Sequence, residues 1–262
     1  MQRLNMVNIN PKDDICEKMP SRLRIFMFIA VASGFLAADA SGLNQGELVQ
    51  MAQCRDYFNT QRPEAYSVCY PLADADVSEA QKLVGDMFFW GWGDALQKNS
   101  KKALLWYKRS AIAGNTEAKY NLGVMFEQGI GTPVNYNKSI RWFWSAGEEG
   151  HVNAQFNLAN MYSKGAGTRQ DEVRAFKWYL RAAKQGEVVS QYNVGNRYVR
   201  GLGVETNPLE AYKWYSLAIN QGDMDAQKNK EILTKKMTEE EIEKAKKMVE
   251  DWKPYLESNS QR

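Results

Sequence analysis

The sequence repeats itself every 36 residues over more than half of its length, and this periodicity limits the folds that the chain can adopt. Three consecutive segments, which begin at Ala118, Ala154 and Ser190, align without a gap. The same step separates four tryptophans and four glycines: Trp106, Trp142, Trp178 and Trp214; Gly114, Gly150, Gly186 and Gly222. A further copy begins at Ala80, and its step to Ala118 is 38 residues, so it carries two extra residues. A repeat of this length indicates small units that bury their apolar faces against one another.

Each copy contains the signals of two helices. In the first, apolar residues recur every four positions, as in Ala118, Leu122 and Phe126, which is one face of an α-helix. Paired glycines such as Gly129 and Gly131 follow, and they favour the backbone turn past a helix C-terminus. The second helix has good N-cap residues at the 36-residue step: Asn99, Asn135, Asp171 and Asn207. We therefore predict an all-α solenoid of antiparallel helix pairs, with the repeated Trp and Tyr in its core rather than in a cofactor site.

The two ends of the array depart from the repeat. Residues 41–79 are interpreted as a degenerate repeat that forms an N-terminal capping hairpin, followed by four repeats over residues 80–225. Residues 226–262 comprise a half repeat and a final helix, which starts with the capping-box residues Thr238 and Glu241. Apolar residues share one face of that helix: Ile242, Ala245, Val249, Trp252 and Leu256. A C-terminal capping helix of this kind covers the last apolar face of an array.

Residues 1–40 are typical of an upstream extension and a secretory signal peptide. Two arginines precede an apolar run over residues 25–37, which is too short for a bilayer span of about 20 residues. Small residues at 38–40 favour cleavage after Ala40, and Met19 is the start that gives an ordinary signal length. A buried helix or an uncleaved anchor is the alternative. We expect the mature chain to be exported, periplasmic or secreted, without a membrane span.

Two cysteines remain in the mature chain after that cleavage. Cys54 and Cys69 are 15 residues apart, and the break at Arg62 and Pro63 suits a hairpin that brings them together. In an oxidising compartment a disulfide over this distance stabilises by about 3 kcal/mol. Two buried free thiols are the alternative.

Composition argues against several classes of function. Lys and Arg number 34 and Asp and Glu 31, so a net charge of +3 predicts no nucleic-acid partner. The single histidine, His151, leaves little for a metal cluster or a histidine-based triad. The chain also lacks HExxH, CxxC and phosphate-loop motifs. We therefore expect a non-enzyme without metal or cofactor, and a monomer.

The repeat spacing A-x-x-x-L-G-x-x-[YF]-x-x-G-x-G, followed by A-x-x-W-[YF]-x-x-A-x-x-x-G, resembles the Sel-like repeat, a relative of the tetratricopeptide repeat. The likeness covers four copies from Ala80 to Gly222 and a half copy, with small departures at Ala159, Gly147 and Ser190. It implies a right-handed superhelix whose first helices line a concave surface, and a role in protein interactions. Some exported bacterial members resemble periplasmic scaffolds, and others are similar to immunity proteins that neutralise secreted lipases.

Residues of the first helices are the candidates for contact with a partner. Positions two before the L of the L-G step, with their neighbours, give a stripe of aromatic, amide and charged side chains: Lys82, Asp86, Tyr120, Asn121, Phe156, Asn157, Asn160, Tyr192, Asn193 and Asn196. Such a stripe suits an extended polypeptide, and substitution of Asn157 and Asn196 is then expected to weaken partner binding without unfolding. In the alternative interpretation, the rings pack against the preceding second helix and the amides cap carbonyls within the stack.

Two functions therefore remain open. The first is an envelope protein that holds or inhibits a polypeptide partner, with immunity against a secreted lipase-type effector as its sharpest form. The second is a scaffold or assembly factor for a periplasmic or envelope complex. A further alternative, a hydrolase of a cysteine-rich subgroup linked to β-lactam binding, is disfavoured because the two mature cysteines precede the first full copy.

Overall fold

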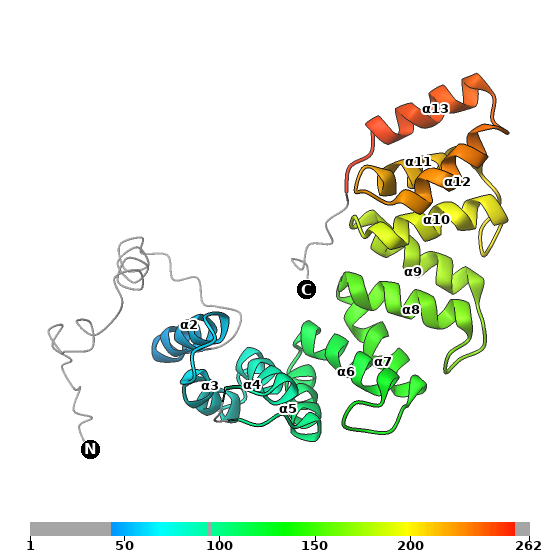
Figure 1. Ribbon diagram of the computed structural model, residues 1–262. Coiled ribbons are helices and arrows are strands. Elements are labelled where there is room, and N and C mark those ends of the chain that lie inside the picture. The colour runs from blue at the N-terminus through cyan, green and yellow to red at the C-terminus, as the bar shows by residue number, and fades with distance from the viewer. Residues whose placement is uncertain (1–42, 94–95, 255–262) are drawn as a thin grey trace, which may run out of the picture. The chain divides into compact units, whose positions relative to one another are not determined.

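The computed structural model describes residues 43–93 and 96–254, which form helices and no strand (Figure 1). The helices are α2 (Gln45–Asn59), α3 (Ala65–Asp74), α4 (Ser78–Trp90), α5 (Ser100–Ile112), α6 (Thr116–Gln128), α7 (Tyr136–Glu148), α8 (Val152–Lys164), α9 (Glu172–Lys184), α10 (Val188–Arg200), α11 (Pro208–Ile219), α12 (Met224–Thr234) and α13 (Glu239–Glu250). The chain divides after Leu48 into two compact units, and the second unit contains all of the repeats. The expected signal peptide, residues 1–40, lies outside the described residues.

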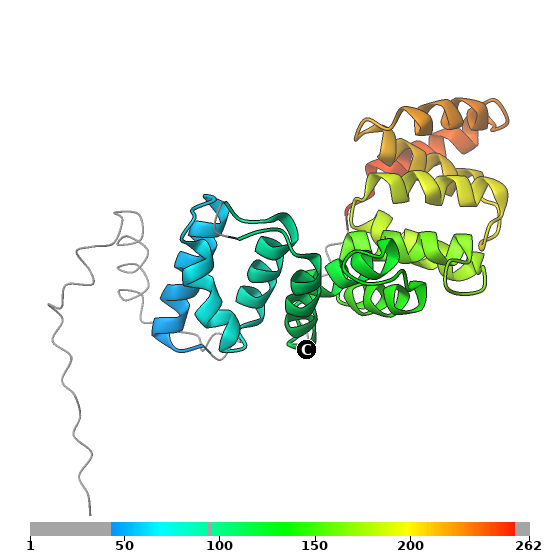
Figure 2. The ribbon, with the colours of Figure 1, turned by 60° about the horizontal axis from the view of Figure 1, so that its bottom comes forward.

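The helices from α3 to α12 pack in chain order, as Figure 2 shows. We call α4, α6, α8 and α10 the first helices and α5, α7, α9 and α11 the second helices, with α12 as the first helix of the half copy. Each first helix packs on the second helix that follows it, and each second helix packs on the next first helix. In addition, α6 contacts α8 and α10 contacts α12. The predicted all-α solenoid of antiparallel helix pairs is confirmed.

Capping residues set the helix boundaries where the sequence predicts them. The N-cap side chains of the second helices each accept a backbone N–H from the first helical turn: Asn99, Asn135, Asp171 and Asn207. Three first helices end at a left-handed glycine: Gly129, Gly165 and Gly201. The second position of each glycine pair requires glycine for a different reason. At Gly203, a Cβ would lie 2.0 Å from the Glu172 carbonyl oxygen at the start of α9, so the loop requires glycine to approach that closely.

Aromatic side chains of the second helices form much of the core between helices. Trp178 is 8% exposed and Trp214 2%, whereas Trp106 and Trp142 are only half-buried. The glycine of the L-G step allows the two helices of a pair to approach. A Cβ on Gly123 would lie 2.4 Å from the Phe143 ring.

A buried polar side chain links successive repeats at one position of the first helix. Gln155 donates to the Gly147 carbonyl of the preceding copy at 2.9 Å, and Gln185 at the end of its own copy donates to the Gln155 side chain at 2.8 Å. The second copy carries Lys119 at this position, and its ammonium pairs with Glu149. A neutral amide pair in one copy is therefore replaced by an ion pair in another.

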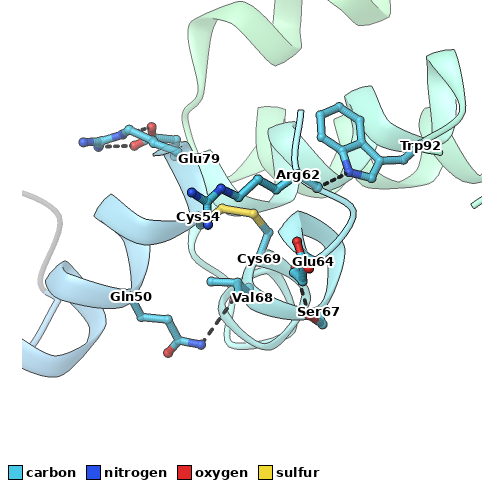
Figure 3. Close-up of a disulfide and its surroundings, with 10 residues drawn as sticks. Gln50, Cys54, Arg62, Glu64, Ser67, Val68, Cys69, Glu79 and Trp92 are labelled. Atoms are coloured by element: carbon cyan, nitrogen blue, oxygen red, sulfur yellow. Dashed lines mark hydrogen bonds and ion pairs between the residues drawn. A yellow bond between two sulfur atoms is a disulfide. The ribbon is translucent and has the colours of Figure 1, made fainter. Parts of the chain in front are cut away.

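Cys54 and Cys69 form a disulfide that joins α2 to α3 (Figure 3). Both cysteines are fully buried. The adjacent loop folds onto this hairpin, because the Trp92 indole N–H donates to the Arg62 carbonyl at 2.9 Å. The Trp92 ring also stacks on Phe58 with centroids 5.0 Å apart.

At the other end of the array, α13 packs against α11. The predicted capping box is confirmed, since Thr238 and Glu241 each accept the other's backbone N–H. Ala245 is fully buried, and Trp252 lies 6.5 Å from Trp214 between ring centroids. Leu256, also expected on this face, lies outside the described residues.

Candidate protein-binding surface

The ten predicted contact residues all lie on first helices. We call the surface that they form the first-helix face: Lys82 and Asp86 on α4; Tyr120 and Asn121 on α6; Phe156, Asn157 and Asn160 on α8; Tyr192, Asn193 and Asn196 on α10. Only Asp86 is buried, at 7% exposure, and the other nine are half-buried. The face therefore presents partly accessible side chains from four helices at corresponding positions.

Three of these residues are engaged inside their own helix pair. Each accepts a hydrogen bond from a tyrosine hydroxyl of the second helix. Tyr107 donates to Asp86 Oδ1 at 2.6 Å, and Tyr179 donates to Asn160 Oδ1. Tyr215 donates to Asn196 Oδ1 at 2.8 Å. Each bond joins the first helix to the second helix of one repeat. These three side chains accept hydrogen bonds from hydroxyl groups rather than cap backbone carbonyls, and substituting Asn196 is therefore expected to lower stability as well as any affinity.

The second copy replaces this polar pair by an apolar one. Phe143 takes the place of the tyrosine, and Val124 takes the place of the acceptor. Val124 is half-buried and packs against the cluster that contains Phe143. The hydroxyl and its acceptor are thus present together or absent together.

Each of the three predicted rings lies near an aromatic ring of a second helix. Tyr120 is 5.8 Å from Phe143, Phe156 is 6.0 Å from Tyr179 and Tyr192 is 6.2 Å from Tyr215, between ring centroids. Each partner belongs to the following helix of the same pair, not to the preceding one.

The amides of the first-helix face differ in what they bond. Burial raises the pKa of Tyr120, and the Asn157 side chain of the neighbouring first helix opposes that rise. Asn193 donates to the Val189 carbonyl one turn earlier in its own helix, at 2.8 Å. At the next step, Asn229 of α12 donates to the Tyr192 hydroxyl at 3.3 Å and to Asn196 Oδ1 at 3.0 Å.

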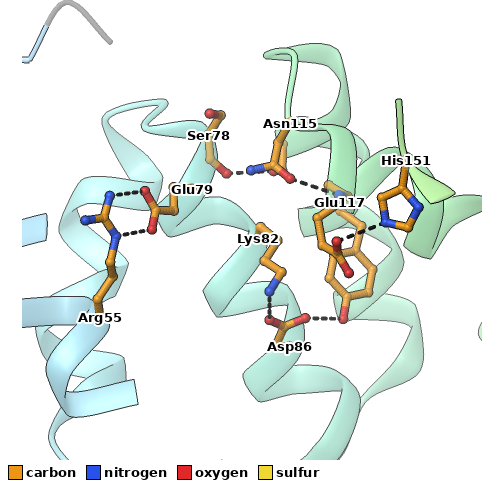
Figure 4. Close-up of polar contacts among 11 residues, drawn as sticks. Arg55, Ser78, Glu79, Lys82, Asp86, Asn115, Glu117 and His151 are labelled. Carbon is orange, nitrogen blue, oxygen red and sulfur yellow. Dashed lines mark hydrogen bonds and ion pairs between the residues drawn. The ribbon is translucent and has the colours of Figure 1, made fainter. Parts of the chain in front are cut away.

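Two functional candidates that sequence reasoning missed, Glu117 and His151, lie beside the predicted residues (Figure 4). His151 Nε2 is 3.0 Å from Glu117 Oε2, and the imidazole stacks on Tyr120 with centroids 4.4 Å apart. His151 Nδ1 accepts the Ala154 backbone N–H and so caps α8. The signal in the sequence was its register, because the 36-residue step places His151 with the cap residues Asn115, Glu187 and Asp223.

Charge on this part of the face is arranged in two pairs. Lys82 Nζ is 2.9 Å from Asp86 Oδ2, and burial raises the pKa of Asp86 while Lys82 and the Tyr107 hydroxyl oppose that rise. The hydrogen bond with His151 lowers the pKa of Glu117. Lys82, Asp86 and Glu117 thus place ionisable groups of both signs at this end of the face.

The side chains of the first-helix face are aromatic, amide and charged. The part of the chain that the structure describes contains no group of three or more His, Cys, Asp or Glu that could hold a metal ion. No helix within residues 43–93 and 96–254 is both long and apolar enough to cross a membrane. Rings, amides and ion pairs offer surface and hydrogen bonds to another polypeptide.

Comparison with known proteins identifies the family to which the repeats belong. The Sel1 repeat model matches four consecutive segments, residues 78–115, 116–151, 152–187 and 188–223. A solved Sel1 repeat protein from Oxalobacter formigenes is 28% identical with a TM-score of 0.64, covering 67% of this chain and 72% of that chain. The structure of c5321, a protective antigen present in uropathogenic Escherichia coli strains, displays an SLR fold and is 27% identical with a TM-score of 0.68. That match covers 79% of this chain and 45% of c5321.

Among curated proteins, chitin synthase regulatory factor 3 of Schizosaccharomyces pombe is 39% identical over 59 residues. The aligned part is 22% of this chain and 6% of that protein, so the chain spans a small part of the curated relative that it matches. The four repeat matches, in contrast, cover residues 78–223 without interruption. Because they include more than half of the sequence, the chain belongs to the Sel1 repeat family.

Proposed function

We propose that this protein is a non-catalytic binding module that holds a polypeptide partner across its first-helix face. The observation that carries the proposal is a repeated amide beside a repeated ring. Asn121, Asn157 and Asn193 occupy the same position on three consecutive first helices, and all three are half-buried. Amide groups can pair with a peptide backbone, and the neighbouring rings supply contact area at low entropic cost. Arrays of helix pairs offer extended surfaces for such contacts.

We also propose that the protein acts after export, in the periplasm or outside the cell. The disulfide between Cys54 and Cys69 supports this, because disulfides persist in oxidising compartments. The sharpest form of the function is inhibition of a secreted lipase-type effector. A scaffold or assembly role in an envelope complex is the second form, and the same face serves either.

Partner capture with matched variants tests the binding proposal. The test variant replaces Asn121, Asn157 and Asn193 by Ala, which removes three amides at one register. The control replaces Lys101, Asn137 and Val173 by Ala, three exposed residues at one register of the second helices. Each protein is used to capture partners from an envelope fraction, and bound partner is quantified against the unmodified chain.

We expect the test variant to retain less than about a tenth of the captured partner, a loss of roughly 1.4 kcal/mol or more, while the control retains it all. Thermal unfolding of both variants checks that the array is intact. Equal capture by the test variant would show that the first-helix face is not the binding surface. A lipase-inhibition assay with the captured partner then separates inhibition from a scaffold role.

A further inference from the structure

A cleft of about 540 Å³ opens between the second helices α5 and α7, away from the residues of the first-helix face. Its walls and floor come from α5, α6, α7 and the loop between the last two. The lining residues are Leu104, Leu105, Lys108, Leu122, Phe126, Thr132, Lys138, Arg141, Trp142 and Ser145. Sites for small organic ligands typically have volumes of about 300–1,000 Å³.

The cleft exists because this copy departs from the others at one residue of α7. Ser145 corresponds to Arg181 and Leu217 in the next two copies. Arg181 reaches from α9 to Glu148 of α7 at 2.8 Å and lies over the Trp178 ring, and Leu217 is buried. The short serine side chain fills no such space between α5 and α7.

A second position on α5 contributes to the same opening. Lys108 corresponds to Trp144 and Leu180, so a flexible cation replaces a bulky apolar side chain. Trp142, which lines this cleft, is half-buried, whereas Trp178 is 8% exposed.

Charge around the cleft has a single sign. Lys108, Lys138 and Arg141 are exposed, and no acidic residue lines the cleft. Within the described part of the chain none of the three cations forms an ion pair. The Lys138 ammonium instead lies 5.2 Å from the centre of the Phe126 ring.

We propose that this cleft binds a monomeric anionic amphiphile of the fatty-acid class. The acyl chain lies on the apolar floor of Leu104, Leu122 and Trp142, and the carboxylate pairs with the cations at the mouth. An apolar floor removes the chain from water, and exposed cations without a partner complement one negative headgroup. The cleft is confined to one interval of the array, which suits a short chain rather than a continuous peptide helix.

Calorimetric titration with dodecanoate below its micellar concentration tests the proposal. Dodecyltrimethylammonium, which has the same chain length and the opposite charge, is the ligand control. We expect one dodecanoate to bind per chain, at least about tenfold more tightly than the cationic amphiphile, a difference of roughly 1.4 kcal/mol. Equal affinity for the two amphiphiles would overturn the proposal. Binding only to vesicles that contain an anionic phospholipid, with none to dodecanoate, would also overturn it.

Variants taken from the repeat itself locate the site. Ser145→Leu installs the residue of the fourth copy and is expected to weaken dodecanoate binding about tenfold or more by filling the cleft. Lys138→Gln with Arg141→Gln is expected to abolish the preference for the anion without altering the apolar floor, and it keeps the test valid if the leucine variant unfolds. Lys177→Gln, at the position of Arg141 one copy later, is the matched control and is expected to bind normally. Unchanged binding in both test variants would contradict the assignment.

Discussion

Polar side chains between the helices of this protein are exchanged in pairs rather than singly. Tyr179 donates to Asn160 in one copy, and Phe143 accompanies Val124 in another. A buried polar group that loses its partner retains the full cost of leaving water, whereas an apolar pair of similar shape has no such cost. The repeats thus contain both arrangements at this contact, a hydrogen-bonded polar pair and an apolar pair.

A double-mutant cycle on Tyr179 and Asn160 tests this pairing. Tyr179→Phe alone is expected to lower the free energy of unfolding by about 1–2 kcal/mol, because the Asn160 side chain loses its donor. Adding Asn160→Val, which reproduces the second copy, is expected to recover most of that loss. Urea unfolding of the two single variants and the double variant measures the coupling, and simple additivity would argue against paired exchange.

The pairing of Glu117 with His151 predicts a dependence on pH. The hydrogen bond with His151 lowers the pKa of Glu117, so this carboxylate stabilises the fold above its unfolded pKa. That contribution is lost as the pH falls through the lowered, folded-state pKa. Because Glu117 is half-exposed, the stability difference from Glu117→Gln is expected to be modest, about 0.5–1 kcal/mol at pH 7, and to shrink toward pH 3. Urea unfolding at several pH values measures it, and a difference independent of pH would contradict the assignment.

At the scale of elements, the helices are held by apolar residues whose burial depends on the neighbouring repeat. Trp178 and Trp142 occupy the same position of α9 and α7, yet only Trp178 is covered. Arg181 lies over the Trp178 ring at 4.6 Å, whereas the corresponding residue beside Trp142 is Ser145. Residues at the same repeat position are therefore expected to contribute different amounts to the free energy of unfolding.

Truncation of the two tryptophans is expected to show this difference. Trp178→Ala is expected to cost about 3–5 kcal/mol of unfolding free energy, the range for buried aromatic residues. Trp142→Ala is expected to cost clearly less, because its side chain is already partly in contact with water. Equal losses in thermal or urea unfolding would show that the cleft beside Trp142 does not exist in solution.

Whether a structural feature could be predicted from the sequence depends on how far apart in the chain the residues that determine it lie. The N-caps such as Asn135 and the capping box at Thr238 follow from a few neighbouring residues, and the structure confirms them. The helix pairs follow from the 36-residue step, and they too are confirmed. The hydrogen bond that Asn196 accepts could not be predicted from the sequence of its own helix, because the donor, Tyr215, lies 19 residues away on another helix. The cleft beside Ser145 required the packing of two second helices to be known.

For the whole molecule, packing of each helix mainly on its neighbours limits how far a local loss of stability extends along the array. Helices of the array pack mainly on their neighbours in the chain, so a perturbation at one end is expected to reach the other end weakly. The disulfide, which joins α2 and α3, stabilises one end only.

Removal of the disulfide tests this limit. Cys54→Ala with Cys69→Ala is expected to destabilise the N-terminal hairpin by about 3 kcal/mol, since the closed loop spans 15 residues. Hydrogen exchange should accelerate in α3 and α4 and remain nearly unchanged in α10 and α11. Uniform acceleration along the chain would instead indicate that the array unfolds as one cooperative unit.

Hydroxyl-radical footprinting of the protein with its captured partner bound tests the proposed binding face most directly. We predict that Tyr120, Phe156 and Tyr192 lose most of their reactivity in the complex, because a polypeptide then covers the accessible part of these half-buried rings. Trp144, which is 52% exposed on a second helix, should react as it does in the free protein. Full reactivity of the three first-helix rings, with protection confined to second helices, would contradict the account.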